Sequence, residues 1–124
     1  DFNDPPGATS VTEHLRATKN LDALLNPEGD PRLFNLFGDK DAEDGWGTHY
    51  YKGQWFIFDQ IVVSPGLLDE EGWSCDRASA QTINTLCRPE DRKHRPWRFG
   101  EQHFNGKRGY SDHFPVTARL RVQP

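Results

Sequence analysis

The feature that most constrains the fold is a run of alternating side chains within residues 54–64. Every second side chain is large and apolar except for one carboxylate, and the set is Trp55, Ile57, Asp59, Ile61 and Val63. A strand sends alternate side chains to one face, so the pattern predicts a strand from Gln54 to Ser64. Asp59 then shares an apolar face, and its carboxylate needs a hydrogen-bonding or charged partner to offset desolvation. A functional site and a structural salt bridge both meet that need.

Further strands are predicted on both sides of this run. Thr48 to Tyr51 precedes Lys52-Gly53, where glycine tolerates the positive φ of a tight hairpin. Residues 77–86 alternate weakly and favour another strand. The last segment alternates clearly, and its side chains predicted to face inward are Val116, Ala118, Leu120 and Val122.

Two helices are predicted in the first third of the chain. Ser10-Val11-Thr12-Glu13 is typical of a helix start in which Ser10 caps the first turn. Asp30 before Pro31 predicts a second helix, with an apolar face from Leu33 to Phe37. Short helices and strands in this order indicate an α/β layered domain, although so few strands leave a sheet face or edge uncovered.

Length and charge limit the classes of protein that fit. A chain of 124 residues forms one domain at most, and its 34% hydrophobic content predicts a core rich in aromatic residues. No window approaches the roughly 18 consecutive apolar residues of a membrane helix, so we expect no membrane span. Acids dominate residues 1–76 and bases dominate residues 77–124, which suits a metal site beside a phosphate-binding surface or an ordinary solvated surface.

The cysteines and the first residue leave the compartment open. Cys75 and Cys87 lack the Cys-x-x-Cys spacing of a zinc site, and they fit either a disulfide in an exported protein or two free thiols. The sequence begins at Asp1 and contains no Met, so we expect an upstream segment to be missing. That segment would carry any export signal, and the localisation therefore stays unknown.

Side chains suited to chemistry occur near both ends of the sequence. Asp1 and Asn3 flank Phe2, so an extended segment would project an acceptor and an amide from one face. Ser111-Asp112-His113 precedes the last strand, but adjacent residues cannot align as a hydrolase triad. A carboxylate beside an imidazole instead suits a metal ligand next to a group that handles phosphate charge or protons. A purely structural Asp-His pair is the alternative.

A basic segment lies between the predicted strands of the second half. Trp97 lies within it, and its bases are Arg88, Arg92, Lys93, Arg95 and Arg98. Such a loop could follow a nucleic-acid backbone while Trp97 stacks on a base. The alternative is a solvated loop in which Trp97 is a packed anchor.

Three separated motifs follow one another along the chain. They are Asp1-Phe2-Asn3-Asp4, then residues 51–55 continuing into Phe58-Asp59-Gln60-Ile61-Val62-Val63-Ser64, and finally Gly109-Tyr110-Ser111-Asp112-His113-Phe114-Pro115-Val116. In this order they resemble the C-terminal half of the endonuclease/exonuclease/phosphatase superfamily. The resemblance implies that residues 1–124 are part of a four-layered α/β sandwich, one sheet with flanking helices, whose N-terminal half is missing.

The resemblance also implies a reaction and roles for five residues. It implies hydrolysis of phosphodiester or phosphomonoester bonds with Mg²⁺ or Mn²⁺. Asp1 would activate or orient the attacking water, and Asn3 would position it and bind phosphoryl oxygens. Asp112 would be a metal ligand, and His113 would contact the scissile phosphate while Asp59 holds its imidazole. The family's metal-anchoring Glu has no counterpart here, so we expect the fragment alone to be inactive.

Partners follow from the same resemblance. The substrate would be a phosphate ester, with nucleic acid, lipid and nucleotide phosphates all open. An uncovered half-sandwich predicts pairing with the missing half, or self-association with a second copy through the face bearing Trp55, Ile57 and Ile61. The competing hypothesis is a non-catalytic phosphate- or nucleic-acid-binding module derived from the same fold. The presence of all five site residues argues against it.

Overall fold

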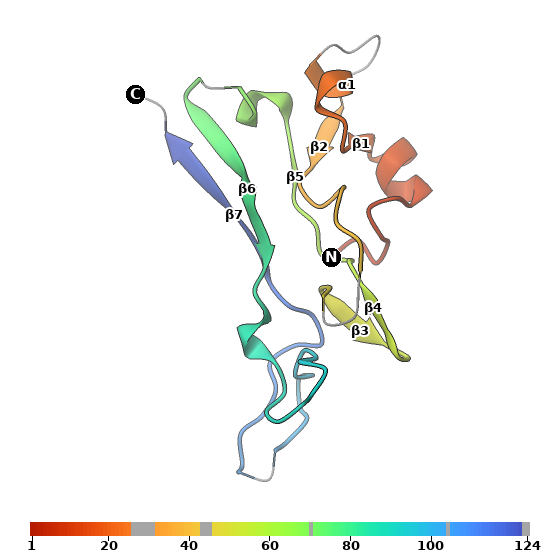
Figure 1. Cartoon of the computed structure of the whole chain (residues 1–124), viewed down its shortest axis with the longest axis vertical. Coiled ribbons are helices and arrows are strands. Elements are labelled where there is room, and N and C mark those ends of the chain that lie inside the picture. Colours follow the sequence, from red (N-terminus) through yellow and green to blue (C-terminus); the bar gives the residue numbers. More distant parts are fainter. Residues whose placement is uncertain (26–31, 43–45, 70, 104, 123–124) are drawn as a thin grey trace.

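The computed structural model combines one long antiparallel strand pair with several short strands and few helices (Figure 1). It describes residues 1–25, 32–42, 46–69, 71–103 and 105–122. Among these residues the strands form three separate sheets, of three, two and two strands. The mixed content is consistent with the predicted α/β class. The expectation of one sheet is wrong for the described residues, and after β4 (Gln54–Phe56) the cause is visible, because the Thr48 side chain takes the backbone hydrogen bonds of Phe58 and Asp59.

The first sheet contains β1 (Ala17–Thr18), β2 (Leu33–Asn35) and β5 (Val62–Val63). β1 and β2 are parallel and are connected through α1 (Leu21–Leu25), whereas β2 and β5 are antiparallel. The predicted helix over this segment is therefore wrong from Leu33 onward. Its proposed start at Asp30-Pro31 lies outside the described residues. The side-chain amide of Asn35 is buried and donates to Gln60 Oε1 at 2.7 Å, which ties β2 to the chain before β5.

The first predicted helix is present as a single π-helical turn, η1 (Ser10–His14). The expected cap is wrong, because Thr9 is the N-cap and makes no side-chain capping hydrogen bond. The Ser10 hydroxyl instead donates to Asp4 Oδ2 at 2.6 Å. The helix start is thereby attached to the N-terminal segment.

The second sheet is a hairpin of β3 (His49–Tyr51) and β4 (Gln54–Phe56). Lys52 and Gly53 have φ values of 46° and 93°, the pair of positive angles that a two-residue hairpin turn requires. This prediction is confirmed. The predicted strand from Gln54 to Ser64 is interrupted. β4 ends at Phe56, the amides of Phe58 and Asp59 bind the Thr48 side chain, and strand structure returns only at Val62–Val63, which is β5 of the first sheet.

The third sheet pairs β6 (Trp73–Thr82) with β7 (Val116–Val122), with an irregular register between Asp76 and Gln81. Two short 3-10 turns, η2 (Pro65–Leu67) and η3 (Asn84–Leu86), precede and follow β6. The predicted last strand is confirmed, and the weakly alternating segment is a strand only as far as Thr82. The inward face is confirmed for Val116 and Ala118 and wrong for Leu120 and Val122, which are 47% and 61% exposed.

One apolar core joins the first sheet to the β6–β7 strand pair. Phe37 is fully buried in it, and the other buried members are Leu24, Phe34, Leu36, Ile57, Val63, Cys75 and Ala80. Cys75 and Cys87 are both free thiols, and burial raises the pKa of Cys75. Within the described residues, no helix has the length and apolar character needed to cross a membrane.

Candidate active site

A buried threonine at the start of the β3–β4 hairpin shapes the site. Thr48 is completely buried, and its Oγ1 accepts hydrogen bonds from the backbone amides of Phe58 and Asp59 at 3.0 and 3.1 Å. Its hydroxyl donates to the Phe56 carbonyl, and its own carbonyl accepts from the Phe114 amide at 2.8 Å. One residue therefore attaches the backbone of Asp59 and the segment after His113 to the same strand.

The next residue, His49, holds the Asp112–His113 segment. Its Nδ1–H donates to the Asp112 carbonyl at 2.9 Å, and its ring lies against that of His113 with centroids 4.2 Å apart. A β-bridge also joins the backbones of His49 and His113. His49 is buried, so these contacts are shielded from water. They place the Asp112 and His113 side chains at the end of the hairpin.

The partner that Asp59 needs is His113. His113 Nδ1–H donates to Asp59 Oδ2 at 2.7 Å, and the two side chains are 20% and 16% exposed. The donation from Nδ1 leaves Nε2 available on the other side of the ring. Nε2 lies 3.9 Å from Asp1 Oδ2. The structure thus brings Asp1, Asp59 and His113 together from three distant parts of the sequence, while their chemical roles stay predictions.

The N-terminal motif differs from its expected geometry. Asn3 has a φ of 53°, and its backbone amide donates to Asp1 Oδ1 at 2.9 Å, so the segment forms a tight turn. The expectation of an extended segment is wrong, because the Asp1 carboxylate binds the backbone two residues later. Phe2 donates its amide to the Phe58 carbonyl and so attaches this turn next to Asp59. Asn3 is exposed, and its place in the site stays a prediction.

Asp112 has a partner that the sequence did not indicate. Its Oδ2 accepts from the Arg98 guanidinium at 3.2 Å, and both side chains are about half exposed, at 45% and 55%. An exposed pair of this kind contributes little stability, because water and salt screen it. The Asp112 carboxylate is therefore held weakly and remains open to exchange.

The described side chains fit a divalent cation. Two groups offer ligand atoms that lie within 4.8 Å of one another, namely His49, Asp112 and His113, and Asp1, Asp59 and His113. Each group contains a carboxylate, the donor that Mg²⁺ and Mn²⁺ prefer, and the imidazoles are further donors that Mn²⁺ accepts.

The basic loop is anchored by buried groups. Trp97 is 5% exposed, so the alternative in which it packs as an anchor holds and the stacking hypothesis is wrong. Arg95 binds both carboxylate oxygens of Asp91, at 2.7 and 3.1 Å, and this lowers the pKa of Asp91 to about 2. Two of the charged side chains in the loop therefore neutralise each other.

A close backbone contact connects this loop to the Asp112–His113 motif. The Trp97 carbonyl accepts from the amides of Tyr110 and Ser111 at 2.9 and 3.2 Å. A Cβ at Gly109 would overlap the backbone oxygens of Trp97 and Arg98, so only glycine allows this approach. The loop and the motif after it are thus fixed against each other.

Sequence reasoning missed three residues of this site. Thr48 and His49 were only the start of a predicted strand, and alternation gives no sign that a strand residue binds loop amides. Arg98 was one base among several in a loop, and its partner lies 14 residues away.

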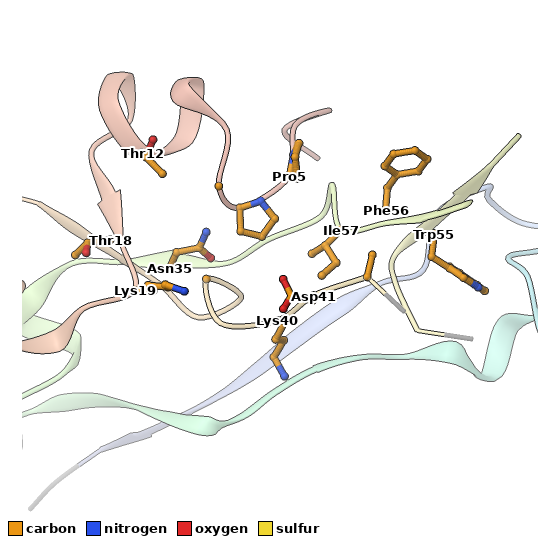
Figure 2. Close-up of a pocket in the computed structure, with 14 residues that line it drawn as sticks. Pro5, Thr12, Thr18, Lys19, Asn35, Lys40, Asp41, Trp55, Phe56 and Ile57 are labelled. Carbon is orange, nitrogen blue, oxygen red and sulfur yellow. The ribbon is translucent and has the colours of Figure 1, made fainter. Parts of the chain in front are cut away.

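Figure 2 shows a pocket with few charged lining residues, and it lies apart from the predicted site residues. It has a volume of about 370 Å³ and lies among the N-terminal segment, the first sheet and β4. Lys19 and Asn35 line one end and Phe56 lines the other. None of the five predicted site residues lines it.

Comparison with protein families agrees with the geometry. The model of the endonuclease/exonuclease/phosphatase family matches residues 1–122 of the chain. The chain belongs to the endonuclease/exonuclease/phosphatase family. No match is found among curated proteins or among solved structures.

Membership of the endonuclease/exonuclease/phosphatase family gives the cluster a chemical setting. Proteins of this family are generally hydrolytic enzymes and typically metal-dependent, and the chain has their nuclease- and phosphatase-type hydrolase fold. The two groups of metal-ligating side chains agree with that dependence without identifying the ion.

Proposed function

We propose that the intact protein containing this chain is a Mg²⁺- or Mn²⁺-dependent phosphoesterase that hydrolyses phosphodiester or phosphomonoester bonds. The observation that carries the proposal is the meeting of Asp1, Asp59 and His113, in which one imidazole is hydrogen-bonded to one carboxylate and faces another. Family membership supports the same reaction class.

The chain's own residues divide the work of hydrolysis. Asp59 fixes the His113 ring by accepting from Nδ1, so that Nε2 contacts a non-bridging oxygen of the scissile phosphate. Asp1 accepts a proton from the attacking water and aligns it with the P–O bond that breaks. Asn3 binds the phosphoryl oxygens through its side-chain amide. Asp1 returns the accepted proton to solvent, and the leaving oxygen takes a proton from a solvent water and departs as an alcohol.

The ion has a defined place in this proposal. Asp112 would hold it, with further oxygen ligands from the rest of the intact protein. When bound, a divalent cation neutralises charge that develops on the phosphoryl oxygens. We further propose that the remaining ligands come from an N-terminal half of the same four-layered domain, so that residues 1–124 alone have little or no activity.

Pairing is the second part of the proposal. The face expected to pair is wrong for Trp55 and Ile57, which are buried within the chain. The exposed apolar side chains Trp73, Leu120 and Val122 lie at the end of the β6–β7 strand pair away from the candidate active site (Figure 1). They support an interface with that other half or with a second copy of the chain, because contiguous exposed apolar surface marks contact sites.

The test is turnover of bis(p-nitrophenyl) phosphate by the intact protein, with Mg²⁺ and with a chelator. We expect chelation to abolish turnover and His113→Ala to lower kcat by about 10²- to 10³-fold, the contribution of one donor that stabilises charge developing on the phosphoryl oxygens. His14→Ala is the matched control, because His14 is exposed on η1. Turnover that survives both chelation and His113→Ala would overturn the proposal.

A binding module without catalysis is the second candidate, and the Arg98–Asp112 ion pair favours it because it occupies the proposed metal ligand. Equilibrium binding of a phosphodiester by the intact protein, with no product formed when Mg²⁺ or Mn²⁺ is added, would establish this candidate. Product formation that requires Asp112 would eliminate it.

A further inference from the structure

A cavity of about 400 Å³ lies next to the candidate active site, between the β3–β4 turn and the basic loop. Its lining includes Lys52 from the turn and Arg88 and Arg98 from the loop. Asp112 also lines it, so the cavity shares a wall with the proposed metal ligand. A group bound here would be next to the reacting phosphate.

Some of the cationic side chains that line this cavity are only loosely paired with carboxylates or have no such partner among the described residues. Arg95 also lines it, but this guanidinium is held by both oxygens of Asp91. Arg88 lies 4.0 Å from Glu101, a carboxylate that also lines the cavity, and both side chains are about half exposed, so this pair is loose. Within the part of the chain that the structure describes, Lys52 has no carboxylate partner, and its ammonium lies 5.1 Å from the Tyr51 ring centroid. The cavity therefore carries cationic groups that an anion can bind.

Arg98 connects the cavity to the site. Its guanidinium binds Asp112 at 3.2 Å, and the exposure of both groups makes the pair easy to separate. A divalent cation on Asp112 would compete with Arg98 for the same carboxylate. Arg98 would then lie free in the cavity, where its planar donors match a phosphate group.

We propose that this cavity binds a second phosphate group of the substrate, and that Arg98 changes partner from Asp112 to that phosphate when a divalent cation occupies Asp112. The substrate class is thus an ester with at least two phosphates. This inference rests on the proposed function, because it places the second phosphate relative to the reacting one.

The exchange has a thermodynamic signature that does not require turnover. If Arg98 leaves Asp112 for the phosphate, then cation and anion each tighten the binding of the other by the same factor. Arg98→Ala should act on the two ligands in opposite directions, because it removes a competitor of the cation and a partner of the anion.

The experiment is calorimetric titration of the intact protein with Ca²⁺ and with matched pairs of ligands that differ by one phosphate. The nucleic-acid pair is the dinucleotide dTpdT with and without a 5′-phosphate, and the headgroup pair is inositol bisphosphate and monophosphate. We expect the added phosphate to tighten binding about tenfold in one pair, which identifies the source of the second phosphate. Equal affinities within both pairs would overturn the inference.

Two variants distinguish a specific contact of Arg98 with the added phosphate from the loss of one positive charge on the loop. We expect Arg98→Ala to remove most of the gain from the added phosphate, to lower the salt slope of binding by about 1, and to raise the Ca²⁺ affinity. Arg92→Ala is the control, because Arg92 is exposed on the same loop outside the cavity. Equal losses in the two variants, or weaker Ca²⁺ binding in Arg98→Ala, would overturn the inference.

The outcomes also separate this inference from the proposed function. Phosphodiester turnover with no gain from a second phosphate would leave the phosphoesterase in place and overturn the cavity assignment. An Arg98-dependent gain with no turnover would support the cavity assignment and contradict catalysis.

Discussion

Two antiparallel strand pairs of this molecule are held together in opposite ways. The strands of β3–β4 are three residues long, yet directly before β3 lies Thr48, a fully buried residue whose side chain hydrogen-bonds the backbone of the segment leading to Asp59. The β6–β7 strands are ten and seven residues long, and their far end exposes Trp73 and Val122. Strand length therefore does not decide where a side chain is positioned firmly; buried polar contacts do.

The largest expected effect tests whether only the β3–β4 strand pair, and not β6–β7, positions residues for the reaction. Asp59 and Asp76 are both carboxylates with a cationic or imidazole partner, His113 beside one strand pair and Arg121 in the other. We expect Asp59→Asn to lower kcat of the intact protein by about 100-fold, because the His113 ring loses its orienting acceptor. Asp76→Asn should leave kcat unchanged in the same steady-state assay. A loss of similar size in Asp76→Asn would mean that the β6–β7 strand pair also positions the site.

The next test removes the buried hydroxyl. Thr48→Val keeps the shape of the side chain and leaves two backbone amides without an acceptor, so we expect the free energy of unfolding to fall by about 2 kcal/mol. Thr117→Val, in β7 where the side chain is exposed, should change it by less than about 0.5 kcal/mol. Urea denaturation of both variants checks the difference. Equal values would remove the contrast between the two strand pairs.

The pH dependence of stability tests a third polar contact, the Asp91–Arg95 pair in the basic loop beside the site. The pKa of Asp91 is lowered from 3.8 to about 2 by Arg95, so this pair stabilises the folded chain above about pH 4 and the contribution is lost as the pH falls toward 2. We expect about 1 kcal/mol, after allowance for the exposure of Arg95. Asp91→Asn should flatten the stability curve between pH 4 and 2. An unchanged slope in the variant would contradict the assignment.

The smallest effect is expected at the exposed end of β6–β7. Leu120 is 47% exposed, so Leu120→Lys should change the free energy of unfolding of the chain by less than about 0.5 kcal/mol. Sedimentation of the same variant tests the pairing proposal, because a charge at an interface should shift an assembly toward its separate parts. A stability loss above about 1 kcal/mol without any change in assembly would show that this end is already covered.

Local patterns predicted the parts of the fold that depend on neighbouring residues. Lys52-Gly53 specified the tight turn through its φ requirement, and Val116–Val122 specified a strand through alternation. The spacing of Leu33, Phe34 and Phe37 suits a helix face, but Phe34 pairs with Val63 in β5, and such a distant partner leaves no local signal. Propensity gives way to tertiary pairing there.

The site was predictable in composition and less so in geometry. Asp59 on an apolar face required a partner, and the motif resemblance named His113, which it contacts. The turn at Asn3 and the ion pair of Arg98 with Asp112 were not predictable. In a folded chain several hydrogen-bond donors lie within reach of a carboxylate, and their spacing in the sequence does not show which of them it binds.

The glycine contact behind the site has a consequence for how such a protein can diverge. Any side chain at Gly109 would strike the backbone of Trp97 and Arg98, whatever residues those two positions carry. Single side chains of the basic loop can therefore be substituted without disturbing this contact. The close approach of the loop backbone to Gly109, in contrast, has to be kept together with the motif that follows it. Chimaeras that exchange the loop should accordingly take their crossover points before Leu86 and after Ser111, so that both sides of the contact come from one parent.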